Sequence, residues 1–159
     1  MHLFTLAGAT IVALCGIEGA ARLGRAAQRD IERVDAYITL LRYIRMQIDC
    51  FARPISEILT RCEGELLTSC GVPEGERVSD ILTLFSFCEV SDKEARGIIS
   101  DFCADFGRNY LGEQLKRCDF SIGVLEERRA ALMEELPKKK KLSATLCVSA
   151  ALAIIILLI

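Results

Sequence analysis

Cysteine is the residue of this chain with the richest possible chemistry, because thiolates bind zinc, form disulfides and act as nucleophiles. None of the eight cysteines forms a C-x-x-C pair, and the single histidine is His2, so the spacing does not fit a zinc site. Most occupy apolar positions of helical repeats, where cysteine packs as a small hydrophobic residue. We predict that they fill a core as free thiols, and a thiol-redox membrane protein is an alternative that rests on the cysteine count alone. The eight are Cys15, Cys50, Cys62, Cys70, Cys88, Cys103, Cys118 and Cys147.

Other reactive arrangements are incomplete. Gly19 to Gly24 and Gly107 to Gly112 have the glycine spacing of a P-loop, but neither is followed by the Lys-Ser/Thr pair that would hold phosphate and magnesium. Adjacent carboxylates such as Glu126-Glu127 and Glu134-Glu135 are typical of a solvated helix surface. The sequence therefore predicts no catalytic residue, no cofactor-binding residue, no metal ligand and no small-molecule substrate, and the protein is not expected to be an enzyme.

The two ends of the chain are apolar. All 20 Lys and Arg residues lie between Arg22 and Lys141. Leu142 to Ile159 carries no charge, and a helix of that length covers about 27 Å, close to the thickness of a bilayer core. Leu3 to Ala21 is apolar as far as Ile17, after which Glu18 stands one turn before Arg22. We predict a transmembrane helix at each end.

Basic residues flank both predicted spans on the side of the middle segment. Four arginines follow the first span and four lysines precede the second: Arg22, Arg25, Arg29, Arg33, Lys138, Lys139, Lys140 and Lys141. The positive-inside rule therefore places the middle segment in the cytoplasm. With Glu18 set aside, this segment holds 20 basic and 21 acidic side chains, a formal charge of −1. A nucleic-acid partner is not expected at that charge.

A cleaved signal peptide is the alternative for the first segment. It would carry Lys or Arg before its apolar run, whereas only Met1 and His2 precede Leu3. We therefore expect an uncleaved anchor. The tetralysine Lys138 to Lys141 is the ordinary cytoplasmic flank of a span, with a specific acidic-lipid or partner site as its alternative.

Apolar residues at alternating three- and four-residue steps predict two long helices, one leaving the first span and one returning to the second. The outgoing seam comprises Ile31, Val34, Ile38, Leu41, Arg45 and Ile48, and the return seam comprises Leu111, Leu115, Cys118, Ile122, Leu125, Arg129, Leu132 and Leu136. Since both spans anchor on one face of the membrane, the two helices must be antiparallel. Packing within the chain is favoured over an oligomeric coiled coil.

Short helices are predicted between the long ones. Pro54 opens the first of them, and Ser79 and Asp80 cap a strongly apolar helix over Ile81 to Val90, which we expect to be the most buried element. Ser91 with Glu94 forms a capping box for the next helix. In the return helix, Pro137 predicts a kink or a break.

The predicted fold class is therefore all-α, a helical bundle built on a long antiparallel helical hairpin and flanked by N- and C-terminal transmembrane helices. The predicted domains are a transmembrane helix over residues 1–21, a cytoplasmic helical-bundle domain over 22–141 and a transmembrane helix over 142–159. Small residues recur at helical spacing in both spans: Ala9, Ala13, Gly16 and Ala20 in the first, Ser143, Cys147 and Ala151 in the second.

This layout, together with two stretches of sequence, resembles the stage III sporulation protein AB family of endospore-forming bacteria. Gln47-Ile48 and the stretch Pro54 to Leu59 look like the family's E-I…T-P-L-x-E-A-L segment, and Phe106-Gly107 to Gln114 is similar to its F-G…L-G pattern. The resemblance covers the whole layout. Gln47 stands where the family has an acid, and Arg53 stands where it has Thr.

The resemblance implies a platform or scaffold subunit of the channel between mother cell and forespore. Its cytoplasmic helical domain would be similar to that of the platform proteins of type II secretion and type IV pilus systems. The expected partners are the membrane, other sporulation channel subunits and a secretion-type ATPase on the cytoplasmic side. The expected location is the cell membrane, on the mother-cell side in the forespore outer membrane. A generic membrane-anchored helical adaptor of another envelope complex is the alternative function.

Overall fold

The computed structural model describes residues 2–106 and 110–158. Within them the chain is all-helical, as predicted. Two helices are long, α1 (His2–Phe51) and α6 (Leu111–Leu158), and four are short, α2 (Ile55–Arg61), α3 (Gly64–Ser69), α4 (Ile81–Ser86) and α5 (Lys93–Asp105). The chain divides into two compact units. The central unit is Asp30–Ala131, and the terminal unit is formed by Met1–Arg29 together with Leu132–Ile159.

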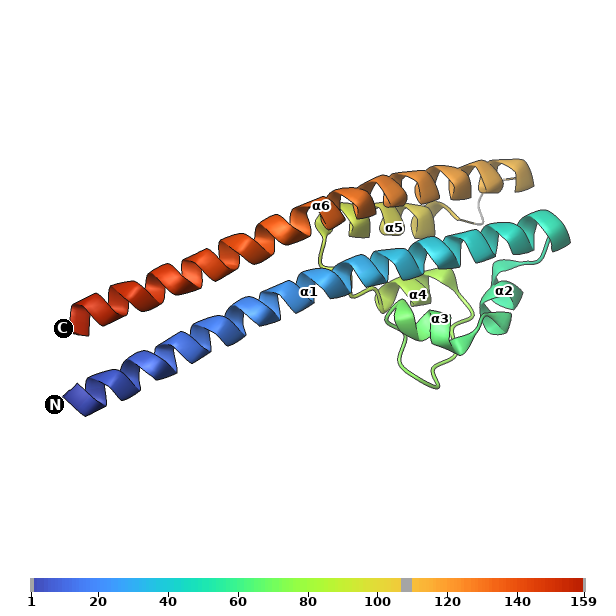
Figure 1. The fold of residues 1–159 in the computed structure, drawn as a ribbon. Coiled ribbons are helices and arrows are strands. Elements are labelled where there is room, and N and C mark those ends of the chain that lie inside the picture. The colour runs from blue at the N-terminus through green and yellow to red at the C-terminus, as the bar shows by residue number, and fades with distance from the viewer. Residues whose placement is uncertain (1, 107–109, 159) are drawn as a thin grey trace. The chain divides into compact units, whose positions relative to one another are not determined.

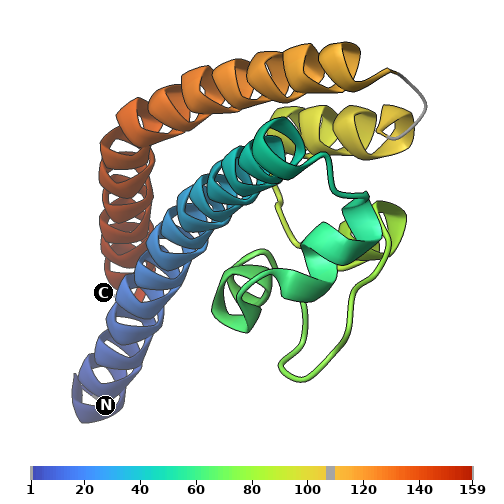
Figure 2. The same cartoon turned by 90° about the vertical axis from the view of Figure 1, so that its right-hand side faces the viewer.

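In the central unit, the second half of α1 and the first half of α6 lie side by side and antiparallel (Figure 1). Helix α5 lies alongside α6, and the short helices α2, α3 and α4 gather on another side of α1, as the second view confirms (Figure 2). Helix α4 contacts both α2 and α5. The predicted helical hairpin with short helices between its arms is therefore confirmed in this unit.

The predicted seam forms the core. Val34, Ile38 and Leu41 of α1 and Cys118 and Leu125 of α6 are buried. The return seam on α6 is shorter than predicted at its N-terminal end, because its first residue, Leu111, is 50% exposed. Arg45 pairs with Asp119, so in this antiparallel register Leu111 would face a position beyond the end of α1. An apolar seam residue without a facing helix stays in solvent.

The turn after α1 uses an unusual backbone conformation. Ala52 has a φ of +49°, in the left-handed region that costs an L-residue with a Cβ about 1–2 kcal/mol. Pro54 is the N-cap of α2 rather than its first helical residue. Arg53 Nη1 donates to the buried Gln47 Oε1 at 2.9 Å, and its guanidinium lies 4.6 Å from the centroid of the Phe51 ring. Gln47 and Arg53, both noted as differing from the pattern of the resemblance, therefore contact each other.

Helix α4 is shorter and less buried than predicted. Asp80 caps it, as expected, by accepting hydrogen bonds from the Leu82 and Thr83 amides, but the helix ends at Ser86 and Leu82 is 58% exposed. The most buried stretch is instead the middle of α1, which the short helices, α5 and α6 surround. An apolar composition does not bury a six-residue helix at the edge of the bundle.

The prediction of a capping box at Ser91 is wrong by one residue. Asp92 is the N-cap of α5, and its carboxylate accepts from the Ala95 amide at 2.9 Å. The Ser91 amide donates to Asp30 Oδ1 instead, which fixes the approach of the chain to α5. A carboxylate next to a serine takes over the cap because it is the stronger acceptor and favours the positive helix end.

In the terminal unit, α6 continues through Pro137, so the helix is not broken there, and a kink, the other predicted outcome, stays a prediction. The side chains of the small residues predicted to line the spans, such as Ala9 and Cys147, lie outside the described part of the structure, as does Gly107. Among the residues that the structure describes, no helix has a stretch both long and apolar enough to cross a membrane. The two predicted spans are therefore not confirmed.

Candidate interaction surface

The thiols of the central unit are free, and four of them are buried: Cys70, Cys88, Cys103 and Cys118. Burial raises the pKa of Cys70 and raises those of Cys103 to about 12 and Cys118 to about 11. Because the thiolate is the reactive form, these side chains are poor nucleophiles near neutral pH. The observed burial agrees with the predicted packing role and disfavours thiol-redox chemistry.

A buried tyrosine belongs to the same cluster. Tyr37 of α1 is 1% exposed, and its hydroxyl lies beside the Cys88 thiol without a partner of normal hydrogen-bond geometry among the described residues. Burial, and then the neighbouring Cys88, raise the pKa of Tyr37. The described residues include no group of three or more His, Cys, Asp and Glu side chains that could hold a metal ion. The cluster is therefore a packed core with one poorly satisfied hydroxyl.

The structure describes one of the two glycine patterns noted in the sequence, together with the paired carboxylates, and none of these forms a reactive site. Gly19 to Gly24 lies inside α1, so no loop is available there to surround a phosphate. Glu126 pairs with Arg42 of α1, and Glu135 pairs with Lys139 one turn along α6. These carboxylates are committed to surface ion pairs.

Charged pairs border the hairpin seam. Arg42 pairs with Glu126 and Arg45 with Asp119, while Asp35 of α1 faces Arg129 of α6 at 2.9 Å. Arg45 and Arg129 occupy seam positions in the predicted repeat, and each turns its charge to the edge of the apolar stripe. Exposed pairs contribute little stability each, so their main effect here is to select the register of α1 against α6.

The linker between α4 and α5 is held by both long helices. Arg33 of α1 donates to the Glu89 carbonyl at 2.9 Å and to the Glu89 carboxylate. From α6, Arg128 donates through Nε and Nη2 to the two oxygens of Asp92, at 2.9 and 2.7 Å. Such a bidentate pair is among the stronger side-chain interactions. Sequence periodicity could not predict these contacts of Arg33 and Arg128 with the linker, because they join residues far apart in the chain.

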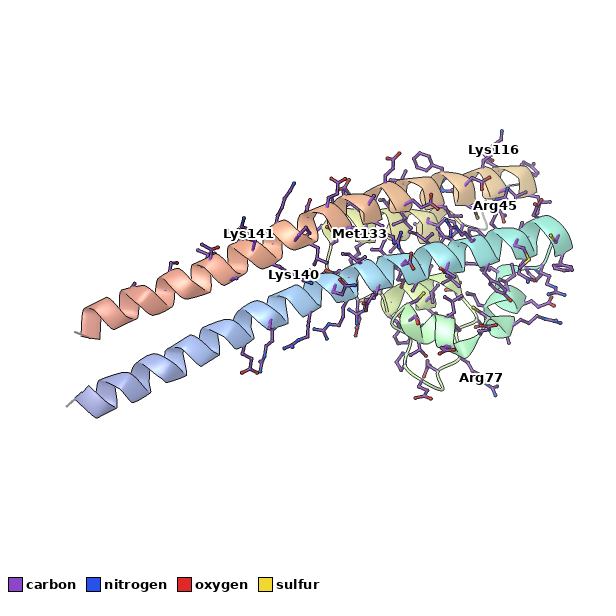
Figure 3. The ribbon with its side chains drawn as sticks, viewed as in Figure 1. Arg45, Arg77, Lys116, Met133, Lys140 and Lys141 are labelled. Carbon is purple, nitrogen blue, oxygen red and sulfur yellow. The ribbon has the colours of Figure 1, made fainter. Side chains whose placement is uncertain are left out.

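The outer face of α6 is the clearest candidate for contact with a partner. It is opposite the seam and repeats at three- and four-residue steps, and we call it the Phe120 face: Glu113, Lys116, Phe120, Gly123 and Glu127. Phe120 is 70% exposed, and a Cβ on Gly123 would meet no atom within 4 Å. Lys116 points away from the bundle (Figure 3). An exposed aromatic ring beside an open glycine, bordered by charges of both signs, suits a protein contact.

Residues 89–159 match the family model described as stage III sporulation protein AB. The predicted resemblance to this sporulation protein family is confirmed. The match includes Glu89 and Asp92 of the linker before α5, helices α5 and α6, and the Phe120 face. It begins at Glu89, so the similarity seen over Arg29 to Leu59 lies outside it. The comparison with curated proteins gave no match, and neither did the comparison with solved structures.

The sequence alone did not single out the Phe120 face. Its signal was present, because Phe120 is a large apolar residue on the polar side of the repeat that begins at Leu111. Apolar residues off the seam of an otherwise regular helix are therefore worth noting as contact candidates.

Proposed function

We propose that the protein is a non-enzymatic platform or scaffold subunit of a sporulation channel or secretion-like complex. The observation that carries this proposal is the family match over residues 89–159. The fold supports it, because the described helices form a packed bundle whose buried polar groups serve structure, and the Phe120 face offers a surface for binding. In this role the protein positions other subunits and catalyses nothing itself.

We further propose that the two ends anchor the protein in the membrane and that the central unit is cytoplasmic. The uncharged stretch Leu142 to Ile159 and the basic residues that flank both apolar ends support this topology. In the terminal unit Leu142 and Leu146 are more than half exposed, which favours an apolar surrounding for this part of α6. In a sporulating cell the membrane would be the outer forespore membrane, on the mother-cell side.

The proposed partners are other channel subunits and, on the cytoplasmic side, a secretion-type ATPase. The Phe120 face supplies an apolar anchor between Lys116 and Glu127, neither of which forms an ion pair with another described residue. The face is part of the segment that matches the family, and we propose it as the surface that such a partner contacts.

Copurification from sporulating cells tests the proposal. A tagged chain should retain channel subunits or the ATPase, and Phe120→Ala should lose at least one of them. Leu82→Ala is the matched control, because Leu82 is also exposed but lies on α4, outside the matched segment. Equal retention by all three chains would remove the Phe120 face from the proposal. Association of the parent chain only with an unrelated envelope complex would favour the adaptor function instead.

Topology is tested separately by thiol labelling of intact cells. In a cysteine-free background, single cysteines placed next to Met1 or after Ile159 should react with a membrane-impermeant reagent. A cysteine at an exposed central position, such as Lys116, should be protected. The reverse pattern would contradict a cytoplasmic central unit.

A further inference from the structure

In the terminal unit, residues of α1 and α6 line an open, shallow cavity of about 430 Å³. The residues that line it are Ala21, Gly24, Arg25, Gln28 and Lys140. Two of these are cations, one from each helix, and none is a carboxylate. Arg25 and Lys140 form no ion pair with any residue that the structure describes. The nearby basic residues Arg22 and Lys139 do have partners, Glu18 and Glu135. The cavity is therefore lined by two basic side chains that have no ion-pair partner among the described residues.

Gly24 positions one of these charges. A Cβ on Gly24 would lie 3.4 Å from both Cγ and Cε of Lys140, so the lysine stem lies across the glycine. The Lys140 side chain points toward α1, whereas Lys141 points away from it (Figure 3). A long apolar stem held against a helix while its ammonium group reaches past it is the usual behaviour of lysine at an interface. The four lysines are therefore not equivalent, and only Lys140 lines the cavity.

We propose that this cavity binds the phosphate of an anionic phospholipid headgroup. The inference rests on the proposed membrane anchoring, which would put Gly24 and Lys140 just outside the apolar segments, at the level of the headgroups. Two unpaired cations from facing helices supply the charge complementarity, and the volume exceeds that of one phosphate group. A phosphate between Arg25 and Lys140 would also hold the two helices together, because each donates to the same group.

The test uses the full-length chain, purified in a neutral detergent and titrated with phosphatidylglycerol or phosphatidylcholine, with bound lipid counted by native mass spectrometry. The parent chain should retain phosphatidylglycerol in preference to phosphatidylcholine. Lys140→Ala should lower that retention about fivefold, whereas Lys141→Ala, with the same change in charge, should lower it less than about twofold. Equal retention of the two lipids, or equal losses in the two lysine variants, would overturn the proposal.

A second pair of variants changes shape and keeps the charge. Gly24→Val should displace the Lys140 stem and lower phosphatidylglycerol retention, while Gly19→Val should not, because a Cβ at Gly19 meets nothing within 4 Å. Unchanged phosphatidylglycerol retention in Gly24→Val would contradict the proposed position of the phosphate beside Lys140. Resistance of the parent chain to carbonate extraction from cell membranes tests the anchoring on its own. A chain that resists extraction but does not discriminate between the lipids refutes only the lipid site.

Discussion

The two units of the molecule use the same pair of long helices in different ways. In the central unit, the apolar residues of α1 and α6 are buried and charged pairs such as Arg42–Glu126 join the helices. In the terminal unit, Leu142 and Leu146 are exposed, and the ion pairs Glu18–Arg22 and Glu135–Lys139 each lie within one helix. Helical periodicity therefore specifies packing only where a partner surface covers the apolar stripe.

The largest effect is expected at the centre of the seam. Leu125 is fully buried, so Leu125→Asp would place an unpaired carboxylate among apolar neighbours and lower the free energy of unfolding by several kcal/mol. Glu126→Ala removes only an exposed pair with Arg42 and should cost less than about 1 kcal/mol. We expect residues 25–136 to fold without the terminal segments, and urea melts of this domain in reductant measure both variants. If the two variants were equally stable, the assigned core would be wrong.

A glycine contact in the central unit gives the next largest effect. Gly71 has a φ of +109°, and a Cβ there would lie 2.5 Å from the Phe87 carbonyl oxygen. Gly71→Ala should therefore destabilise the unit by about 3 kcal/mol, from backbone strain and the displaced chain together. Gly75 also has a positive φ, +85°, but nothing lies within 4 Å, so Gly75→Ala should cost only about 1 kcal/mol. Similar losses in both variants would exclude the close approach to Phe87.

The buried thiols predict a loss of stability at alkaline pH. In the folded state burial raises the pKa of Cys103 to about 12 and that of Cys118 to about 11, so these two thiols ionise first in the unfolded chain as pH rises above about 9. The stabilising contribution is complete below pH 9 and declines toward the folded-state values, by roughly 1 kcal/mol per thiol for each pH unit. Unfolding free energies at pH 8, 9 and 10 measure this slope. Cys118→Ala should make it shallower, while a variant at the exposed Cys50 should not.

The smallest effect is expected in the terminal unit. Leu142 and Leu146 have little packing to lose, so Leu142→Ser and Leu146→Ser should change the thermal unfolding of the full-length chain by less than about 0.5 kcal/mol. The same substitution at the buried Leu41 should lower stability strongly. Thermal melts in detergent compare the three variants. A marked loss in the Leu142 variant would show that the terminal unit has a packed core of its own.

The sequence predicted those parts of the fold that depend on local repeats. The seam of α1 and the cap at Asp80 follow from spacing and from one residue type, and both are confirmed. The exposure of Leu111 was not predicted because it depends on where α1 ends, and that of Leu82 was not predicted because it depends on the position of α4 at the edge of the bundle. The contacts of Arg33 and Arg128 with the linker were also beyond prediction, because each joins residues from different helices.

The Phe120 face and the cavity at Lys140 were likewise only partly predictable from the sequence. Phe120 was visible in the sequence as an apolar residue off the seam, although its exposure had to come from the structure. Among the four consecutive lysines, nothing in the sequence distinguishes Lys140 from Lys141. Only the position of Gly24 on the facing helix separates them.

The ion pair between Arg42 and Glu126 has a consequence for folding time. These residues are 84 positions apart in the chain, so the apolar stripe of α1 meets its partner only after most of the protein exists. At about 5–20 residues per second, synthesis leaves that stripe uncovered for roughly 4 to 17 s. Helical bundles with local contacts fold in microseconds to milliseconds, whereas this hairpin must first close a long loop. The newly made chain is therefore prone to aggregate through the exposed apolar stripe of α1 until α6 has been synthesised.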